Sequence, residues 1–480
     1  MLVYCAVRLA HIGLFPAFVD EVGYITWTRS INLGSFSGAA YAYLGGKPLL
    51  PWLIAPFMPL QNGLWIARVV IVLMGVPALA AILMTGRTLF DSRVALSAGV
   101  IYTLLPLAFF YDRLMMSDPM SADLGMVAIW LSILSVKSRR PSHAILAGII
   151  IGTAMLVKLS TGVVAAAPLL AAGLLVPRRD WIIGTLARIY AIPAAIVAVL
   201  AAGLGKLTAY GMEITVRWYV TDNSLTIFQR AANAASDYLS WMQVYVGLPV
   251  LILAAVGFVW GIIRRDRPTL VAGLLLGLID LQFAVVGGNP FPRYYLLGMA
   301  LLVLLACAAA WQSYDALRRR SSRGLAEVPI LGLAALVAAP MLGFIVQAYT
   351  APQDLPLPQI DREDYIRDRF AGFGAVDAAA WLKNAARTGR PLTILCAHSL
   401  VCDRLDIYLY GTPGIEYASI DMVSPGWLAD QTASRSVFVP DDELAGRNIF
   451  DILKGYHLTQ VGRYPRPGGE TVYTLYQVTP

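Results

Sequence analysis

The chain has 480 residues, and only 14% of them are charged, whereas an average soluble domain carries roughly 25% charged residues. With 58% hydrophobic residues and apolar runs near the ~20 residues that span a bilayer, this composition excludes an ordinary soluble fold. The net charge of +7 does not indicate a nucleic-acid partner, because the arginines cluster at the ends of apolar segments. We therefore expect a multi-pass protein of a lipid bilayer.

Apolar runs predict about 11 transmembrane helices in chain order. They cover residues 1–17, 64–85, 94–111, 119–136, 143–157, 161–176, 182–205, 240–262, 269–287, 294–312 and 326–349. The first run is short and lacks a small-residue cleavage site, so it is interpreted as a membrane helix and not as a signal peptide. Arg8 lies in its middle, which is unusual for such a helix.

Basic residues fall in alternate loops between these runs. They are Arg87 and Arg93; Lys137, Arg139 and Arg140; Arg178 and Arg179; Arg264, Arg265 and Arg267; and Arg318, Arg319, Arg320 and Arg323. The positive-inside rule places these loops in the cytoplasm, and we expect the chain in the inner (cytoplasmic) membrane. The opposite face then carries loops 18–63 and 206–239, breaks 112–118 and 288–293, and all residues after 350.

The composition changes after residue 350, where three prolines within seven residues resemble a linker. We expect a membrane domain over 1–350 and a periplasmic or extracellular soluble α/β domain over 351–480. In the latter, patterning predicts a helix over 361–386 and strands over 392–396, 405–410, 436–440 and 470–478. Five residues separate Cys396 from Cys402, and both a local disulfide and two free thiols fit this spacing.

Two acidic clusters lie on the non-cytoplasmic face. Asp20 and Glu21 directly follow the first apolar run, where a carboxylate is placed to deprotonate an acceptor hydroxyl at the membrane surface. The alternative is a solvated pair or the cap of a following helix. Asp112, Arg113 and Asp118 occupy the next break, and Asp118 has the alternative of a helix N-cap with Pro119 at the first helical position.

Three cations lie on the same face. Lys47 follows Gly45 and Gly46, and it is placed to pair with a phosphate at headgroup level or to snorkel to the interface. Lys158 interrupts an apolar stretch, which favours a functional role over snorkelling because embedded charges are costly. Arg293 precedes Tyr294 before a late helix, where an aromatic interfacial anchor is the alternative.

With these residues the sequence resembles the GT-C membrane glycosyltransferases, in particular bacterial relatives of the protein O-mannosyltransferases and of the aminoarabinose transferase that modifies lipid A. The resemblance covers the hydrophobic part of the chain. It implies a GT-C-like catalytic domain, with Asp20 as the base or acceptor-orienting residue and Glu21 and Asp118 as further catalytic residues. The resemblance also implies that Lys47, Lys158 and Arg293 bind the donor phosphate. Tyr24, Asp112, Arg113 and Tyr294 are placed near the acceptor or substrate.

The implied function is transfer of a hexose or pentose from a polyprenyl-phosphate donor to an extracytoplasmic glycolipid, polysaccharide or protein. Such a donor needs no nucleotide, and no glycine-rich nucleotide-binding loop is found in the sequence. No cofactor is required by this chemistry, although a divalent metal ion is compatible with it. The alternatives are a lipid or sugar transporter or flippase, which the lack of an internal repeat disfavours, and an O-antigen-type ligase or polymerase.

Overall fold

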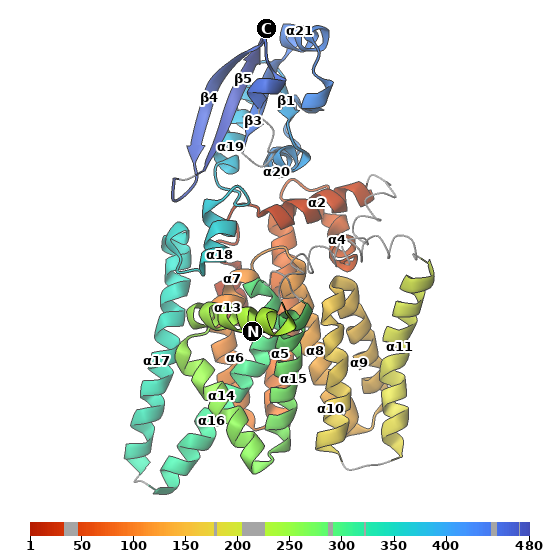
Figure 1. Ribbon diagram of the computed structural model, residues 1–480, viewed down its shortest axis with the longest axis vertical. Helices are drawn as coiled ribbons and strands as arrows, with labels where there is room; N and C mark the ends of the chain where they lie inside the picture. The colour runs from red at the N-terminus through yellow and green to blue at the C-terminus, as the bar shows by residue number, and fades with distance from the viewer. Residues whose placement is uncertain are drawn as a thin grey trace. The chain divides into compact units, whose positions relative to one another are not determined.

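The computed structural model describes residues 1–32, 47–176, 180–203, 226–286, 291–320, 323–442, 449–469 and 471–480. Its chain divides into two units (Figure 1). The first comprises Met1–Ile12, Phe36–Leu53 and Arg68–Ala351, and the second comprises Gly13–Ser35, Ile54–Ala67 and Pro352–Pro480. The C-terminal boundary thus falls where the prolines begin, and two N-terminal segments group with the C-terminal region.

The first unit consists of helices packed side by side (Figure 1). They are α1 (Leu2–Leu9), α4 (Leu49–Ile54), α5 (Gly63–Leu89), α6 (Ser92–Leu104), α7 (Pro106–Tyr111), α8 (Ser117–Ser138), α9 (Pro141–Val157), η2 (Leu159–Ala165), α10 (Ala166–Leu175), α11 (Trp181–Gly203), α13 (Ile227–Tyr245), α14 (Leu248–Arg264), α15 (Arg267–Val286), η3 (Pro292–Tyr295), α16 (Leu296–Arg320) and α17 (Arg323–Thr350). The first turn of α5 belongs to the second unit.

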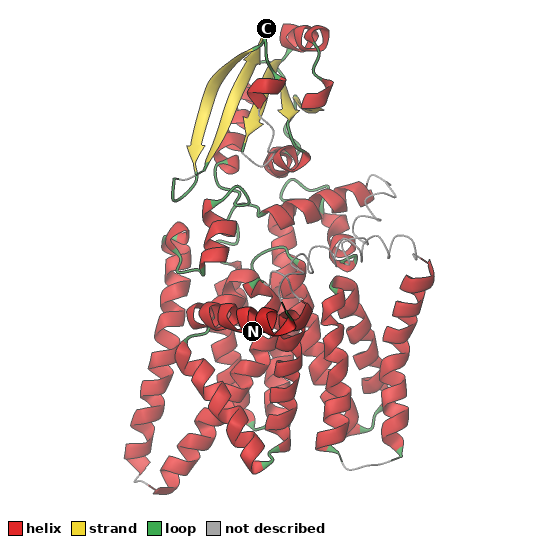
Figure 2. Ribbon diagram, in the orientation of Figure 1, coloured by secondary structure: helices red, strands yellow, loops and turns green. Residues whose placement is uncertain are grey.

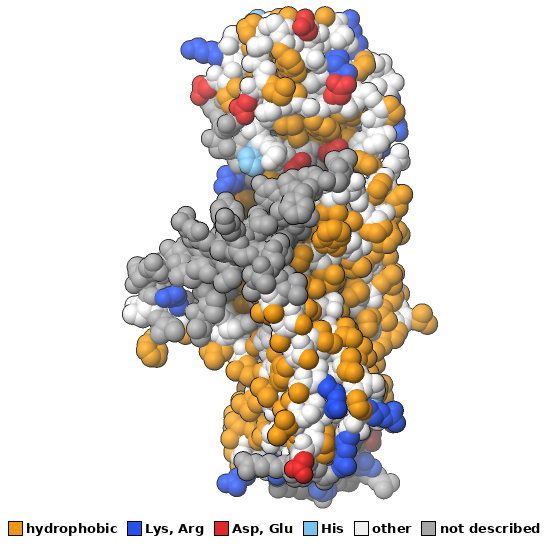
Figure 3. Space-filling model, turned by 90° about the vertical axis from the view of Figure 1, so that its right-hand side faces the viewer, with side chains coloured by type: hydrophobic (Ala, Val, Ile, Leu, Met, Phe, Trp, Pro, Cys, Tyr) orange, Lys and Arg blue, Asp and Glu red, His pale blue; other side chains and the backbone are white. Residues whose placement is uncertain are grey.

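Length and apolar composition make this unit a membrane domain. Among the described residues, 5 helices are long and apolar enough to cross a bilayer, and shorter apolar helices pack beside them. Hydrophobic side chains cover the flank of the unit (Figure 3). On α14, for example, Leu248, Ile252, Val256 and Val259 recur at helical spacing and are each more than half exposed. Such a stripe is stable against lipid, so the expected polytopic helical membrane protein is confirmed.

Several expected spans differ from the observed helices. The run 1–17 is helical only over Leu2–Leu9. The run 94–111 is divided into α6 and α7, because Pro106 cannot donate the hydrogen bond that would continue the helix. The run 240–262 contains the end of α13 and most of α14, since Gly247 adopts a positive φ of 86° between them.

Three of the basic loops predicted to share one face, at 87–93, 137–140 and 318–323, lie at one end of the bundle, whereas Arg178 and Arg179 lie outside the described residues. Lys137 at the end of α8 donates a 3.0 Å hydrogen bond to the carbonyl of Thr88 at the end of α5. Arg93 at the start of α6 pairs with Asp315 near the end of α16 at 2.9 Å. Figure 3 shows Lys and Arg side chains gathered at this end, which agrees with the predicted alternation of loops.

The second unit contains a five-stranded sheet, and its strands appear in yellow in Figure 2. The strands are β1 (Leu392–Cys396), β2 (Ile415–Ser419), β3 (Ser436–Asp441), β4 (His457–Pro465) and β5 (Val472–Thr479), in the order β2-β1-β3-β5-β4. β1 pairs in parallel with β2 and β3, whereas β5 pairs antiparallel with β3 and β4. The helices are α2 (Val19–Asn32), η1 (Ala55–Phe57), η4 (Pro352–Asp354), α18 (Gln359–Arg362), η5 (Glu363–Arg367), α19 (Ala375–Thr388), α20 (Ser399–Leu409), η6 (Ile420–Met422), α21 (Pro425–Ser434) and α22 (Ile449–Ile452).

The expected α/β character is confirmed, but some of its elements are not. Strands at 392–396, 436–440 and 470–478 are confirmed, and the helix over 361–386 is broken between η5 and α19. The strand predicted at 405–410 is wrong, because these residues belong to α20. His398 caps that helix by accepting from the Leu400 N–H at 3.2 Å, and Cys402, Leu405 and Leu409 point into the core at helical spacing.

A disulfide joins Cys396 at the end of β1 to Cys402 in α20, with their Cα atoms 5.6 Å apart. This resolves the alternative that the sequence left open. The helix α2 also packs on α20, where Arg29 forms an ion pair with Asp406. Burial raises the pKa of the Asp406 carboxyl above its usual range, and the charge of Arg29 opposes that shift.

Candidate active site

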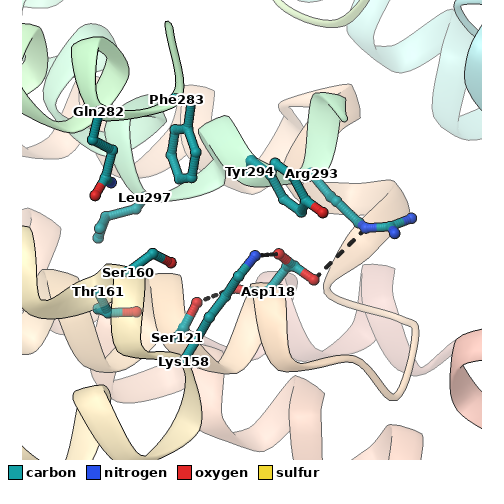
Figure 4. A pocket seen from close by; sticks show the side chains of 10 residues that line it. All are labelled: Asp118, Ser121, Lys158, Ser160, Thr161, Gln282, Phe283, Arg293, Tyr294 and Leu297. Atoms are coloured by element: carbon teal, nitrogen blue, oxygen red, sulfur yellow. Dashed lines mark hydrogen bonds and ion pairs between the residues drawn. The ribbon is translucent and has the colours of Figure 1, made fainter. Parts of the chain in front are cut away.

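A small pocket lies in the membrane unit, where four elements meet (Figure 4). Its lining comes from α8, from the segment that joins α9 to α10, from α15, and from η3 with the start of α16. The lining residues are Asp118, Ser121, Lys158, Ser160, Thr161, Gln282, Phe283, Arg293, Tyr294 and Leu297. Predicted site residues thus meet here from three distant parts of the sequence.

Asp118 lies in the first turn of α8 with 5% of its surface exposed. The N-cap position belongs to Met116, so the carboxylate does not cap the helix as the alternative interpretation required. Instead its two oxygens face cations, with Oδ1 2.5 Å from Lys158 Nζ and Oδ2 3.8 Å from Arg293 Nε (Figure 4). The positive end of the helix dipole also favours a carboxylate at this position.

Lys158 reaches this carboxylate because α9 ends at Val157. Its own backbone is extended, with φ −157° and ψ 119°, and the short helix η2 begins at the next residue. The side chain is 8% exposed, and its ammonium group lies 3.8 Å from the centre of the Tyr294 ring. Attraction between the cation and the ring face adds to the ion pair in holding the ammonium group.

Arg293 and Tyr294 occupy η3, which Pro292 begins at a position where a missing N–H costs nothing. The Arg293 guanidinium lies 4.4 Å from the centre of the Phe291 ring. The residue as a whole is 7% exposed. Tyr294 stacks on Phe283 of α15 at 5.5 Å between ring centres. The aromatic contacts therefore hold the cation in place. These rings line a pocket beside charged groups, so this segment is more than an aromatic anchor at the membrane interface.

Lys47 is half-buried, and its charge also acts on Asp118 together with those of Lys158 and Arg293. All three cations predicted to bind phosphate are therefore found around one carboxylate. Gly45 and Gly46, which precede Lys47, lie outside the described residues. The lining itself carries two cations against one carboxylate, so the pocket holds an excess positive charge in surroundings of low dielectric constant. Such a pocket is suited to an anion.

Asp112 and Arg113 have partners away from this pocket. Asp112 forms a buried ion pair with Arg8 at 2.8 Å and accepts a 3.0 Å hydrogen bond from Tyr4. Arg113 donates to the carbonyls of Ala10 and His11 at 2.8 and 2.7 Å. These contacts attach the N-terminal segment to the turn before α8, and they explain how Arg8 is tolerated in an apolar stretch.

Asp20, Glu21 and Tyr24 all lie in α2 of the second unit. The Glu21 carboxylate is fully buried and accepts a 3.0 Å hydrogen bond from the Phe18 N–H, which makes it part of the helix start. Tyr24 is buried with its ring edge against Trp27 at 5.5 Å. Asp20 is half-buried beside them. The catalytic role of Asp20 remains a prediction from resemblance.

The neutral polar residues of the pocket were not predicted from the sequence. Ser160 and Thr161 follow Lys158 closely, and that proximity was the available signal. Gln282 and Phe283 lie inside an apolar helix with no local motif, so only the fold brings them to the site. Across the described part of the chain, no group of 3 or more His, Cys, Asp or Glu residues is arranged to hold a metal ion.

A family model described as dolichyl-phosphate-mannose-protein mannosyltransferase matches residues 46–204, a range that contains Lys47, Asp118 and Lys158. No curated protein sequence matches the chain.

Among solved structures, the chain is similar to ArnT from Cupriavidus metallidurans bound to undecaprenyl phosphate, with 14% identity and a TM-score of 0.62 over 99% of this chain and 96% of that one. ArnT from the same organism in the apo state gives 15% identity and a TM-score of 0.56 over 90% and 87% of the two chains. The chain therefore has the ArnT fold, and the expected resemblance to GT-C glycosyltransferases is confirmed at the level of the fold.

Proposed function

We propose that this protein is a membrane glycosyltransferase that moves a sugar from a polyprenyl-phosphate donor to an extracytoplasmic acceptor. The observation that carries the proposal is the convergence of Lys158 and Arg293 on Asp118 in one buried pocket. The family-model match and the similarity to ArnT, whose structure holds undecaprenyl phosphate, support the same assignment.

The chemistry follows from where charge develops. The oxygen of the acceptor hydroxyl attacks the anomeric carbon, and the bond from that carbon to the phosphate oxygen breaks with its electron pair going to the phosphate. The acceptor proton passes to a base, for which Asp20 is the candidate from resemblance. Lys158 and Arg293, with Lys47, stabilise the phosphate as its negative charge grows, so the leaving group departs more easily. This displacement would invert the anomeric configuration.

The location in the cell forms part of the proposal. The basic loops at one end of the bundle favour a cytoplasmic position for that end. The disulfide between Cys396 and Cys402 favours an oxidising compartment for the sheet-containing region. Both observations agree with an inner-membrane protein whose C-terminal domain is periplasmic or extracellular.

The experiment that tests the proposal uses the purified full chain in lipid nanodiscs. Binding of decaprenyl phosphate, a polyprenyl phosphate one isoprene unit shorter than undecaprenyl phosphate, is measured first, and transfer from radiolabelled decaprenyl-phosphate sugars to cell-envelope extract is measured second. Lys158→Ala should weaken decaprenyl phosphate binding by about tenfold or more, because it removes a charge-assisted contact in a low-dielectric pocket.

The matched control is Lys454→Ala, which removes an exposed lysine of the second unit and should leave binding unchanged. If the wild-type protein does not bind decaprenyl phosphate, or if Lys158→Ala and Lys454→Ala bind it equally well, the proposal is wrong. Movement of the intact sugar lipid across a membrane without transfer would instead indicate a flippase.

A further inference from the structure

The pocket has two chemically different halves. Arg293, Lys158 and Asp118 occupy one side, whereas Gln282, Ser160 and Thr161 lie on the other (Figure 4). The first half is charged, and the second offers neutral amide and hydroxyl groups. Leu297 lies beside the neutral half, and the rings of Phe283 and Tyr294 border both. A ligand with a charged part and a neutral hydroxyl-bearing part would match this division.

In the neutral half, the side-chain amide of Gln282 has a hydrogen-bond donor without an acceptor among the described residues. Its side chain extends from α15 into the pocket toward Ser160 (Figure 4). The amide nitrogen Nε2 is buried, and no described residue accepts a hydrogen bond from it. A buried donor without an acceptor costs about 1–3 kcal/mol, so such groups normally meet a partner. The donor site faces the pocket, which makes a ligand oxygen the natural acceptor.

The charges of the pocket restrict what that ligand can be. Among the described residues that line the pocket, the single carboxylate, Asp118, is already shared by Lys158 and Arg293. The buried acid of α15, Asp280, is hydrogen-bonded to Tyr238 and is not part of the lining. A protonated amine in the neutral half would therefore meet an excess positive charge and no carboxylate of the lining to pair with.

We propose that Gln282, with Ser160 and Thr161, binds hydroxyl groups of the donor's sugar, and that this sugar carries no amino group. The inference rests on the proposed function, because it assigns the charged half to the donor phosphate. In this arrangement the phosphate binds to Lys158 and Arg293, and the sugar ring extends toward α15. The Gln282 amide then acts as a specificity-determining residue: it satisfies its buried N–H with a sugar oxygen, and it offers no charge to an amine.

The test compares three lipids on the full chain in nanodiscs: decaprenyl phosphate, decaprenyl-phosphate arabinose, and its 4-amino-4-deoxy counterpart. The two sugar lipids differ in one group, a hydroxyl against an ammonium. The wild-type protein should bind the neutral sugar lipid at least about tenfold more tightly than the amino sugar lipid, since the lining holds excess positive charge. Equal binding, or preference for the amino sugar, overturns the inference.

Gln282→Leu tests the residue itself, since it keeps the approximate size and removes the amide. The variant should lose about tenfold in affinity for decaprenyl-phosphate arabinose and less than about twofold for decaprenyl phosphate without sugar, because one hydrogen bond to the sugar is removed. Gln312→Leu, at an exposed position of α16 outside the lining, is the matched control and should change neither. Gln282→Asn serves as the second variant, should Gln282→Leu not fold.

The outcomes separate the inference from the proposed function. If Gln282→Leu and Gln282→Asn weaken both lipids equally or neither of them, Gln282 does not read the sugar and the inference is wrong. That result leaves the donor site intact as long as Lys158→Ala still weakens decaprenyl phosphate binding. Loss of all decaprenyl phosphate binding in the wild-type protein would remove the proposed function itself.

Discussion

The ammonium group of Lys158 lies 2.5 Å from the carboxylate of Asp118, although 40 residues separate them in the sequence. Both side chains are more than nine-tenths buried, so neither charge is well solvated. In the proposed function the pair holds the cation where the donor phosphate needs it, and this preorganisation lowers the cost of ordering the site on binding. Asp118 would then compete with the incoming phosphate for the same cation.

That competition gives the first prediction. Asp118→Asn keeps the size of the side chain and removes its charge, which raises the excess positive charge of the lining. We expect decaprenyl phosphate to bind several-fold to about tenfold more tightly, because an anion then meets less competition in a low-dielectric site. Transfer should slow, since the lipid phosphate product dissociates less readily.

The measurement is equilibrium binding and product dissociation for Asp118→Asn and Lys158→Ala side by side. The two variants should change affinity in opposite directions. If Asp118→Asn instead weakens binding as much as Lys158→Ala does, the carboxylate acts mainly by orienting the two cations, and the competition account is wrong.

A second prediction distinguishes the adjacent acids of α2. Asp20→Asn should reduce transfer by roughly 10²-fold or more, because the amide cannot accept the acceptor's proton. Donor binding and the melting temperature should stay near the wild-type values. Near-normal turnover of Asp20→Asn would exclude it as the base.

The neighbouring Glu21 provides the contrast. Its buried carboxylate accepts the Phe18 N–H at 3.0 Å, so Glu21→Ala should lower the melting temperature of the second unit, with a loss of about 1 kcal/mol as for other helix caps. A stable Glu21→Ala variant without activity would move the chemistry from Asp20 to Glu21.

How much of this site the sequence could predict depends on the kind of signal each residue carries. Lys158 and Arg293 were predictable because a charge inside or beside an apolar run is costly and needs a reason. Asp112 carried the same kind of signal, but its partner is Arg8, and a sequence does not show which cation an acid will meet. Gln282 gave no signal, since it carries no charge and belongs to no local motif.

The elements of the fold also differ in how well the sequence predicts them. Apolar runs predicted the membrane unit because a bilayer requires long apolar helices, whatever their packing. The segment 405–410 was mispredicted as a strand because its short alternating pattern fits both structures. The cap at His398 and the packing of Leu405 and Leu409 against the sheet favour a helix. The packing contacts depend on the tertiary structure, so the local sequence does not show them.

Close helix packing in the membrane unit gives a third prediction. A Cβ atom on Gly148 of α9 would lie 2.4 Å from the backbone oxygen of Ile189 in α11, and a backbone atom cannot easily move away. We expect Gly148→Ala to force the two helices apart and to cost about 1–3 kcal/mol.

The measurement is the melting temperature of the full chain in detergent. Gly173→Ala is the matched control, because a Cβ atom on Gly173 meets nothing within 4 Å and the residue lies in α10. That change should be neutral or slightly stabilising, as alanine favours helices. If both variants melt alike, α9 and α11 are not in close contact at Gly148.

The last prediction concerns topology, on which the proposed direction of transfer depends. In a background with Cys5 and Cys307 replaced by serine, Asn384→Cys places a thiol at an exposed position of α19, and Ser142→Cys places one at an exposed position at the start of α9. A membrane-impermeant maleimide should label Asn384→Cys in cells whose outer envelope alone is permeable. Ser142→Cys should react only after the inner membrane is broken, because it adjoins the basic cluster at Lys137 and Arg140. Labelling of Ser142→Cys but not of Asn384→Cys in the first condition would place the sheet-containing region in the cytoplasm. The disulfide between Cys396 and Cys402 would then lie in a reducing compartment, and transfer to an extracytoplasmic acceptor would be untenable.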